Sequence, residues 1–170
     1  MVMPRSPIMT SSTVRVFRPS PRPTKGKGQG GFDPAGVFAR LGLVASNREE
    51  LVAEIRHGLP VNVIDKLTKE LAISQQALLQ IIALPTATLT RRRRTQKRLT
   101  PQESDRVYRV ATAYRAACQL YEGDSEAARR WLTEPAKALG GNTPLQHLDT
   151  EAGADEVQDL IGRLEQGVIT

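Results

Sequence analysis

The chain has 170 residues, with 24 Lys and Arg against 18 Asp and Glu, two histidines and one cysteine. A chain of this length forms one or two small domains and can fold without disulfides or metal. The lone Cys118 excludes an internal disulfide and is typical of a reducing compartment. The absence of a long apolar run excludes a membrane span, and the absence of a short apolar block after a basic start argues against a secretory signal. We therefore expect a soluble, cytoplasmic, mildly basic protein.

The charge is distributed unevenly along the chain. Residues 1–36 hold six basic residues and one acidic residue, residues 37–118 hold fourteen and seven, and residues 119–170 hold four and ten. A polyanion would be attracted to the basic half and repelled by the acidic half. This asymmetry predicts two different partners.

Residues 1–36 differ from the rest in composition, because they contain six of the eleven prolines and five of the thirteen glycines. Such a segment buries too little apolar surface to offset its chain entropy, so we predict a disordered basic arm. An organelle transit peptide has a similar composition, but its amphipathic helix would not tolerate Pro19, Pro21 and Pro23. The arm would add weak, salt-sensitive affinity for nucleic acid.

Only helix signals follow residue 36. Ser46 and Glu49 form a capping-box pattern before an amphipathic run that ends near Gly58. Apolar residues then recur at three- and four-residue spacing after Pro60. Ser74 is expected to cap a short helix, and Pro85 to open another that contains Leu89 and the run Arg91 to Arg94.

The second half of the chain continues the helical pattern. Thr100-Pro101-Gln102-Glu103 is a strong start signal for a helix to about Gly123, with an apolar stripe at Val107, Val110, Ala111, Tyr114, Cys118 and Tyr121. Further helices are predicted after Asp124 and Thr143 and from Thr150 to Gln166. No segment alternates with period two, so we predict an all-α fold, a bundle of short helices with units at 37–99 and 100–170.

Residues 75–91 have the pattern of a helix-turn-helix. Two short helices joined at Ala83-Leu84 must cross steeply to bury Leu78, Ile82, Leu84 and Leu89 together, which needs a small residue at the turn and an apolar one after it. The turn lacks the usual glycine, but alanine fits there if its φ stays negative, and Pro85 is tolerated in a first turn.

We predict that the second helix of this pair and the run after it bind DNA. Polar residues at its start would face base edges and its basic end would face phosphates. The alternative is an ordinary pair of core helices with a solvated basic face. Six phosphate contacts would give a salt slope of about −5. The predicted DNA-binding residues are Thr86, Ala87, Thr90, Arg91, Arg92, Arg93, Arg94, Lys97 and Arg98.

Several motifs in the second half, in one order, resemble the toxin-binding domain of Xre/ParS-type antitoxins. They begin with Thr100-Pro101-Gln102-Glu103-Ser104-Asp105-Arg106, Glu126-Ala127-Ala128-Arg129-Arg130-Trp131-Leu132 and Ala138-Leu139-Gly140-Gly141-Asn142-Thr143-Pro144-Leu145. Leu148-Asp149-Thr150-Glu151-Ala152-Gly153-Ala154 follows, and the resemblance continues from Val157 to Val168. With the helix-turn-helix included, it covers about residues 45–170. Gln166 stands where many relatives have histidine.

The resemblance implies an antitoxin of a type II toxin-antitoxin system. Its Xre/Cro-like helix-turn-helix domain, residues 37–99, would bind its own operator and autoregulate transcription. Its dimerisation and toxin-binding domain, residues 100–170, would inhibit a RES-type toxin. Such toxins resemble ADP-ribosyltransferases and consume NAD, so the antitoxin would occlude an active-site cleft.

The last predicted helix and the tail after it are the candidate toxin-binding segment. The helix has an apolar face and an acidic face, and it ends in a short apolar tail. We hypothesise that this end enters or covers the partner's cleft; the alternative is a frayed terminus. The residues concerned are Arg163, Glu165, Gln166, Gly167, Val168, Ile169 and Thr170.

No enzyme is expected, because no catalytic constellation is present. His57 and His147 lie on different segments without a Cys or acidic cluster at ligand spacing, and Cys118 lies on an apolar stripe. No phosphate loop, dinucleotide fingerprint, metal site or cofactor is expected.

A homodimer is predicted, because operators read by helix-turn-helix proteins generally require one. Tyr108 and Tyr114 are the candidate interface aromatics, and a higher-order complex would form with the toxin. The alternative function is a stand-alone dimeric transcription regulator without a toxin partner.

Overall fold

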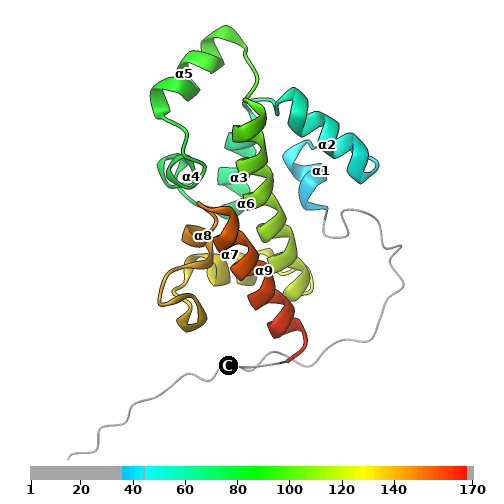
Figure 1. Ribbon diagram of the computed structural model, residues 1–170, viewed down its shortest axis with the longest axis vertical. Coiled ribbons are helices and arrows are strands. Elements are labelled where there is room, and N and C mark those ends of the chain that lie inside the picture. The colour runs from blue at the N-terminus through cyan, green and yellow to red at the C-terminus, as the bar shows by residue number, and fades with distance from the viewer. Residues whose placement is uncertain (1–35, 44, 168–170) are drawn as a thin grey trace, which may run out of the picture.

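The computed structural model describes residues 36–43 and 45–167, and within them the chain forms helices and no strand (Figure 1). The predicted all-α fold is therefore confirmed. Apart from Gly36, the predicted N-terminal arm lies outside the described residues, as do Val168, Ile169 and Thr170. The elements are α1 (Val37–Leu41), α2 (Arg48–His57), α3 (Val63–Leu71), α4 (Gln75–Ile81), α5 (Thr86–Thr95), α6 (Pro101–Leu120), α7 (Ser125–Thr133), the 3-10 turn η1 (Lys137–Leu139), α8 (Pro144–His147) and α9 (Glu151–Glu165).

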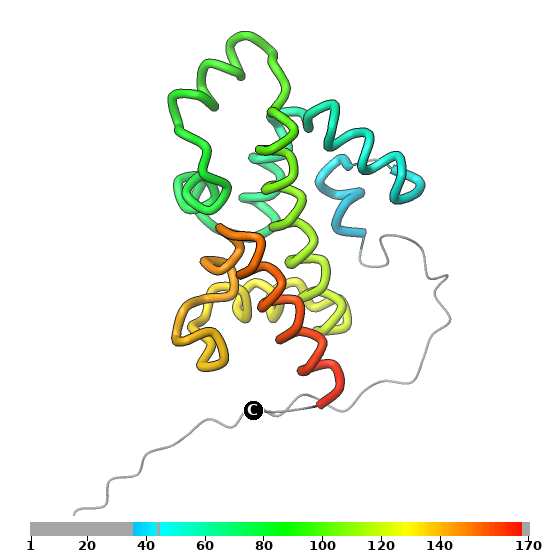
Figure 2. Tube along the Cα trace, in the orientation of Figure 1, coloured from blue at the N-terminus to red at the C-terminus, as the bar shows by residue number. Residues whose placement is uncertain are grey.

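Helix α6 lies at the centre of the fold. It packs against α1, α2 and α3 from the first half of the chain and against α7 and α9 from the second half. Figure 2 shows its trace running through the middle of the molecule. Its apolar stripe is buried as predicted except for Tyr121, which is only partly buried. One continuous apolar core therefore joins the two halves of the chain.

The start of α6 is fixed both locally and by a distant segment. Thr100 and Glu103 form the predicted capping box. The buried Ser104 hydroxyl accepts a hydrogen bond of 2.8 Å from the backbone N–H of Leu59. Leu59 follows Gly58, where a Cβ would lie 2.0 Å from the carbonyl oxygen of Leu99, so only glycine fits. These contacts hold the segment after α2 against the beginning of α6.

Two features near the start of the described chain differ from the sequence prediction. Asn47, rather than Ser46, caps α2, and its side chain accepts a hydrogen bond of 2.9 Å from the N–H of Glu50. The Glu50 carboxylate in turn accepts from the N–H of Ser46 at 2.7 Å, so the predicted cap is shifted by one residue. Helix α1 was not predicted, because five residues are too few to show a period; its buried Val37, Phe38 and Leu41 pack against the core.

The prediction that Tyr114 contributes to a dimer interface is wrong. Its side chain has no exposed surface, and its hydroxyl lies 3.4 Å from the Glu70 carboxylate of α3. Burial raises the pKa of the Tyr114 phenol. The apolar stripe of α6 therefore turns Tyr114 into the core of its own chain. Tyr108 is only partly buried, and its ring centroid lies 5.6 Å from that of Phe38.

The predicted helix starts of the second half are confirmed, whereas α6 ends at Leu120 rather than near Gly123. Asp124 caps α7 by accepting from the N–H groups of Glu126 and Ala127, each at 3.0 Å. Thr143 begins α8 with a capping box, and Thr150 caps α9. Helix α9 ends at Glu165, close to the predicted end at Gln166. Local hydrogen bonds therefore account for most of the helix boundaries in this half.

The turn between α4 and α5 has an unexpected backbone conformation. Ala83 has φ +49°, in the left-handed region, whereas a negative φ was expected. Ala83 is exposed, and its N–H donates to the carbonyl of Gln80 at 3.1 Å. The left-handed region costs a residue with a Cβ about 1–2 kcal/mol, whereas glycine adopts it freely. The turn therefore needs the geometry that glycine usually provides.

Replacing Ala83 with glycine should raise the free energy of unfolding by about 0.5–1 kcal/mol, because strain relief exceeds the added freedom of the unfolded chain. Urea unfolding followed by circular dichroism measures this change. The matched control is Ala53→Gly at an exposed position inside α2, which should lower stability by about 1 kcal/mol. An equal loss of unfolding free energy in the two variants would contradict backbone strain at Ala83.

Candidate functional site

Helices α4 and α5 form a compact helix-turn-helix. The Ser74 hydroxyl caps α4 by accepting from the N–H of Ala77 at 3.1 Å. The N–H of Leu84 donates to the carbonyl of Leu79 at 2.9 Å and closes the turn. As predicted, the residues that fix the crossing of the two helices are buried; they are Leu78, Ile82, Leu84 and Leu89.

The outer side of α5 is polar at its start and basic at its end. Thr86, Ala87 and Thr90 are all exposed. Pro85 precedes the helix and makes no side-chain cap, so no side chain of the N-cap covers the first N–H groups of α5. The structure thus places the predicted base-facing residues on one accessible helix.

Three of the six predicted DNA-binding cations already have partners in the chain. Arg92 pairs with Glu103 of α6, and the two side chains are only 13% and 14% exposed. Arg93 pairs with Asp65 of α3. Arg98 donates to the carbonyl of Gly58 and to Glu54 of α2. Within the described part of the chain, no ion pair engages the remaining exposed cations, Arg91, Arg94 and Lys97.

Glu103 connects the capping box of α6 to α5. Its carboxylate accepts from the N–H of Thr100 at 2.7 Å and from the guanidinium of Arg92. Burial by itself would raise the pKa of Glu103, but the hydrogen bonds from Arg92 and Thr100 outweigh it and lower the pKa. Glu103 is therefore ionised at neutral pH and holds the middle of α5 towards α6.

Two further contacts fix the helix-turn-helix from outside. Arg106 of α6 donates to the carbonyl of Ile82, just before the turn, at 3.3 Å. Asp65 of α3 accepts from Gln75 at the start of α4 as well as from Arg93. Sequence reasoning missed the roles of Asp65 and Arg106. Asp65 and Arg93 are 28 residues apart, so no local pattern could reveal their pairing.

Helix α9 separates an apolar face from an acidic face, as the sequence predicted. Val157, Leu160 and Ile161 are buried in the core. The acidic residues Asp155, Glu156, Asp159 and Glu165 are exposed, together with Arg163. Gln166 and Gly167 are exposed at the end of the helix.

An open groove of about 610 Å³ runs between η1 and α9. Ala138 and Leu139 line it from η1. Two of the predicted toxin-binding residues, Arg163 and Gln166, line it from α9. The structure therefore brings part of the predicted toxin-binding segment into a concave surface, a feature that sequence reasoning did not anticipate.

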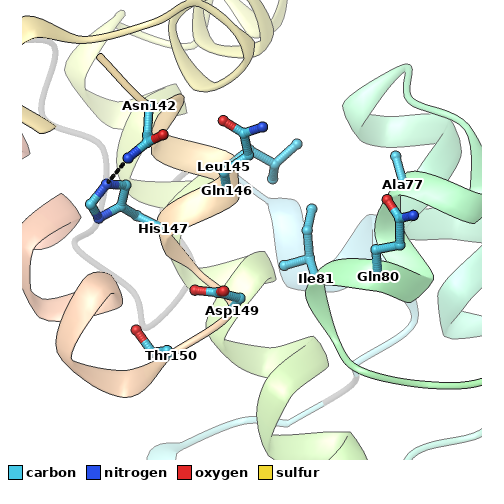
Figure 3. A pocket seen from close by; sticks show the side chains of 9 residues that line it. All are labelled: Ala77, Gln80, Ile81, Asn142, Leu145, Gln146, His147, Asp149 and Thr150. Carbon is cyan, nitrogen blue, oxygen red and sulfur yellow. Dashed lines mark hydrogen bonds between the residues drawn. The ribbon is translucent and has the colours of Figure 1, made fainter. Parts of the chain in front are cut away.

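A second hollow of about 620 Å³ lies between α4 and the region of α8. Figure 3 shows Ala77, Gln80 and Ile81 on one side and His147 with Asn142 on the other. His147 Nε2 lies 3.2 Å from the carbonyl oxygen of Leu139, and Nδ1 lies 3.3 Å from the Glu156 carboxylate. His147 thus links α8 to η1 and α9, which is a structural role.

The described residues contain no group of three or more His, Cys, Asp or Glu side chains that could hold a metal ion. Cys118 is buried in α6, and burial raises the pKa of its thiol, which opposes reactivity. No described helix is long and apolar enough to cross a membrane.

Comparisons with known proteins match both halves of the chain. The family model described as the antitoxin Xre-like helix-turn-helix domain matches residues 50–111. The model described as the antitoxin Xre/MbcA/ParS C-terminal toxin-binding domain matches residues 116–167. Both matches include part of α6.

Individual relatives agree with the family models. A protein named Antitoxin Xre from Yersinia enterocolitica is 41% identical over 134 residues, which cover 79% of this chain and 90% of that protein. A protein of the same name from Photorhabdus laumondii is 32% identical over the same shares of the two chains. A protein from Sphingobium named Prs ADP-ribosylating antitoxin is 24% identical over 83% of this chain and 92% of its own.

A helix-turn-helix domain followed by a helical toxin-binding domain defines an antitoxin of a toxin-antitoxin system. The chain belongs to the Xre antitoxin family.

Proposed function

We propose that this antitoxin binds a RES-type toxin that consumes NAD, occludes the active site of that toxin, and represses its own operon by binding operator DNA. It acts in the cytoplasm by binding alone and is not an enzyme. The observation that carries the proposal is the separation of two surfaces of opposite charge. Arg91, Arg94 and Lys97 are exposed on α5 and the loop after it, whereas the exposed face of α9 carries more carboxylates than cations.

The two surfaces lie at opposite ends of the molecule. Figure 2 shows α5 at the top of the view and the end of α9 at the bottom, with α6 between them. DNA at α5 would therefore not occupy the space needed by a protein bound at the end of α9. This arrangement would allow one chain to hold both partners together.

The acidic face of α9 suits a cleft that binds NAD. Such a cleft needs cationic or N–H groups to hold the two phosphates of the dinucleotide. Exposed carboxylates such as Asp155 and Asp159 would pair with those groups when the antitoxin covers the cleft. The proposed toxin-binding residues are Arg163, Glu165, Gln166 and Gly167 at the end of the helix, continued by Val168, Ile169 and Thr170, which lie outside the described residues.

The test is co-expression with the product of the neighbouring reading frame. Cellular NAD is measured with the neighbour alone and with both proteins, and the purified antitoxin is examined for a stable complex. The proposal expects NAD depletion by the neighbour and its reversal by the complex. If the neighbour's product forms no complex and does not change cellular NAD, the proposal is contradicted. The alternative function, a dimeric DNA-binding regulator, would then remain.

Deleting residues 165–170 should abolish neutralisation in the same assay, because the deletion removes the helix end proposed to cover the toxin's cleft. The described residues removed, Glu165 to Gly167, are exposed, so the thermal unfolding midpoint should change little. Unchanged stability is the control that separates lost contact from lost folding. Full neutralisation by the truncated protein would show that the helix end is not part of the toxin interface.

For DNA binding we propose that Thr86, Ala87 and Thr90 face base edges. Arg91, Arg94 and Lys97 would contact phosphates directly. Arg92, Arg93 and Arg98 are held by carboxylates of the chain and contribute less to phosphate binding. Each phosphate contact adds about −0.9 to the slope of log K against log salt. Three contacts therefore give a slope of about −3 per chain, instead of the −5 expected from six.

Asp65→Asn should release Arg93 for DNA and steepen the slope by about 0.9 per chain. Binding to both operator and unrelated DNA should become tighter at low salt. The measurement is fluorescence anisotropy over a salt series. Asp155→Asn on α9 is the matched control, because it removes the same charge far from α5 and should leave the slope unchanged. Equal slopes for Asp65→Asn and wild type would contradict competition by Asp65.

We also propose a homodimer, which forms a higher-order complex when the toxin binds. Its interface would include Tyr108 and a shallow hollow between α2 and α6 that Val52 and Ile55 line. Val52 is the large apolar side chain that stands out as exposed among the described residues, at 38%.

Light scattering at micromolar concentration should give the mass of two chains, and Val52→Asp should shift it towards one. A strictly monomeric wild type would contradict the dimer.

A further inference from the structure

Helix α9 contains a glycine that the packing of the chain does not require. Apart from its chain neighbours and the nearby backbone of α9 itself, a Cβ built on Gly162 would have no atom within 4 Å. Its φ is not in the left-handed region, and its carbonyl accepts the regular helical hydrogen bond from Gln166 at 3.2 Å. Gly153 in the same helix is different, because a Cβ there would lie 2.1 Å from the carbonyl oxygen of His147. Internal packing therefore explains Gly153 and leaves Gly162 unexplained.

Glycine is less favourable than every residue except proline inside a helix. Alanine at position 162 would fit the space and strengthen α9, so folding alone favours replacement of Gly162. Glycine is useful where another backbone or a ligand must approach the helix closely. The position of Gly162 thus points to a contact outside the described chain.

Gly162 lies in the groove between η1 and α9. The lining from α9 also includes Glu156, Asp159 and Arg163, which makes the charge of this wall negative. Asp159 is exposed and forms no ion pair within the described residues. Ala138 of η1 is small and exposed on the opposite wall. The groove therefore combines close access to the backbone of α9 with carboxylates that favour a cationic occupant.

We propose that this groove receives a basic, extended segment of the toxin, whose backbone lies against Gly162 and whose cationic side chains pair with Glu156 and Asp159. This inference rests on the proposed function and names the contact surface of the same partner. The groove is continuous with Arg163 and Gln166 at the proposed toxin-binding end. A second copy of the chain is a poorer occupant, because a two-fold interface would bring like-charged α9 faces together.

The test uses the full-length antitoxin and the purified product of the neighbouring reading frame. Gly162→Ala and Gly162→Gln both place a better helix former in α9 and add increasing bulk to the groove. Gly162→Ala should raise the thermal unfolding midpoint by about 2–4 °C. The same variant should weaken toxin binding at least tenfold, measured by calorimetry, and Gly162→Gln should weaken it further. Greater stability with lower affinity is the opposite of what a structural glycine would give.

Two further variants separate shape from charge. Ala152→Gln adds similar bulk at an exposed position of α9 that does not line the groove, and it should leave the affinity unchanged. Asp159→Asn keeps the shape of the groove and removes one charge. It should weaken binding severalfold at low salt, with a smaller difference at high salt, because salt screens an exposed charge pair.

The outcomes distinguish this inference from the proposed function. Wild-type protein that fails to bind the neighbour's product contradicts the proposed function. If the wild-type protein binds the toxin and both Gly162 variants bind it with the same affinity, the groove is not the contact surface. The proposed function would still stand. Variants that keep toxin affinity but lose the dimer mass in light scattering would assign the groove to a second copy and also overturn the inference.

Discussion

The structure depends on the burial of the apolar stripe of α6. Val107, Val110 and Tyr114 have no exposed surface, and burial of a large apolar side chain contributes roughly 1.5–3 kcal/mol. Helices α1, α2 and α3 cover one part of α6, and α7 and α9 cover another. Neither half of the chain can therefore complete its core without this helix, and the helix-turn-helix is oriented by the same element that supports α9. Polar contacts such as the Ser104 hydroxyl with Leu59 N–H reinforce this joining of distant segments.

The electrostatics of α5 follow from that packing. With α3 packed against α6, Glu103 and Asp65 reach Arg92 and Arg93 of α5. These pairs help to set the direction of α5 and at the same time reduce the charge available to DNA. The part of the basic run without an ion-pair partner in the described residues is thus smaller than its length suggests. At the other end, α9 buries its apolar residues and leaves its carboxylates in water, so one chain presents opposite charges to two partners.

Sequence patterns predicted well what depends on residues three or four positions apart. The caps of α6, α7, α8 and α9 and the end of the last helix are examples, since each rests on hydrogen bonds within one turn. The N-cap of α2 was predicted one residue too early, because Ser46 and Asn47 are both good N-cap residues. Only the hydrogen bond that the Asn47 side chain accepts in the structure distinguishes them. The φ of Ala83 was predicted with the wrong sign, because a residue with a Cβ usually has a negative φ. The buried residues on either side of the turn impose the left-handed conformation on alanine instead.

By itself, the sequence determined the helical class, the starts of most helices, the residues of the helix-turn-helix and the acidic character of the last helix. These properties depend on local hydrogen bonds and on apolar periodicity, which short segments carry. Only the tertiary structure decided that Tyr114 is internal, that three of the six cations have partners, and that Gly162 borders a groove. The Tyr114 hydroxyl and Glu70 are 44 residues apart in sequence, and they meet only because burial of the α6 stripe brings α3 against it.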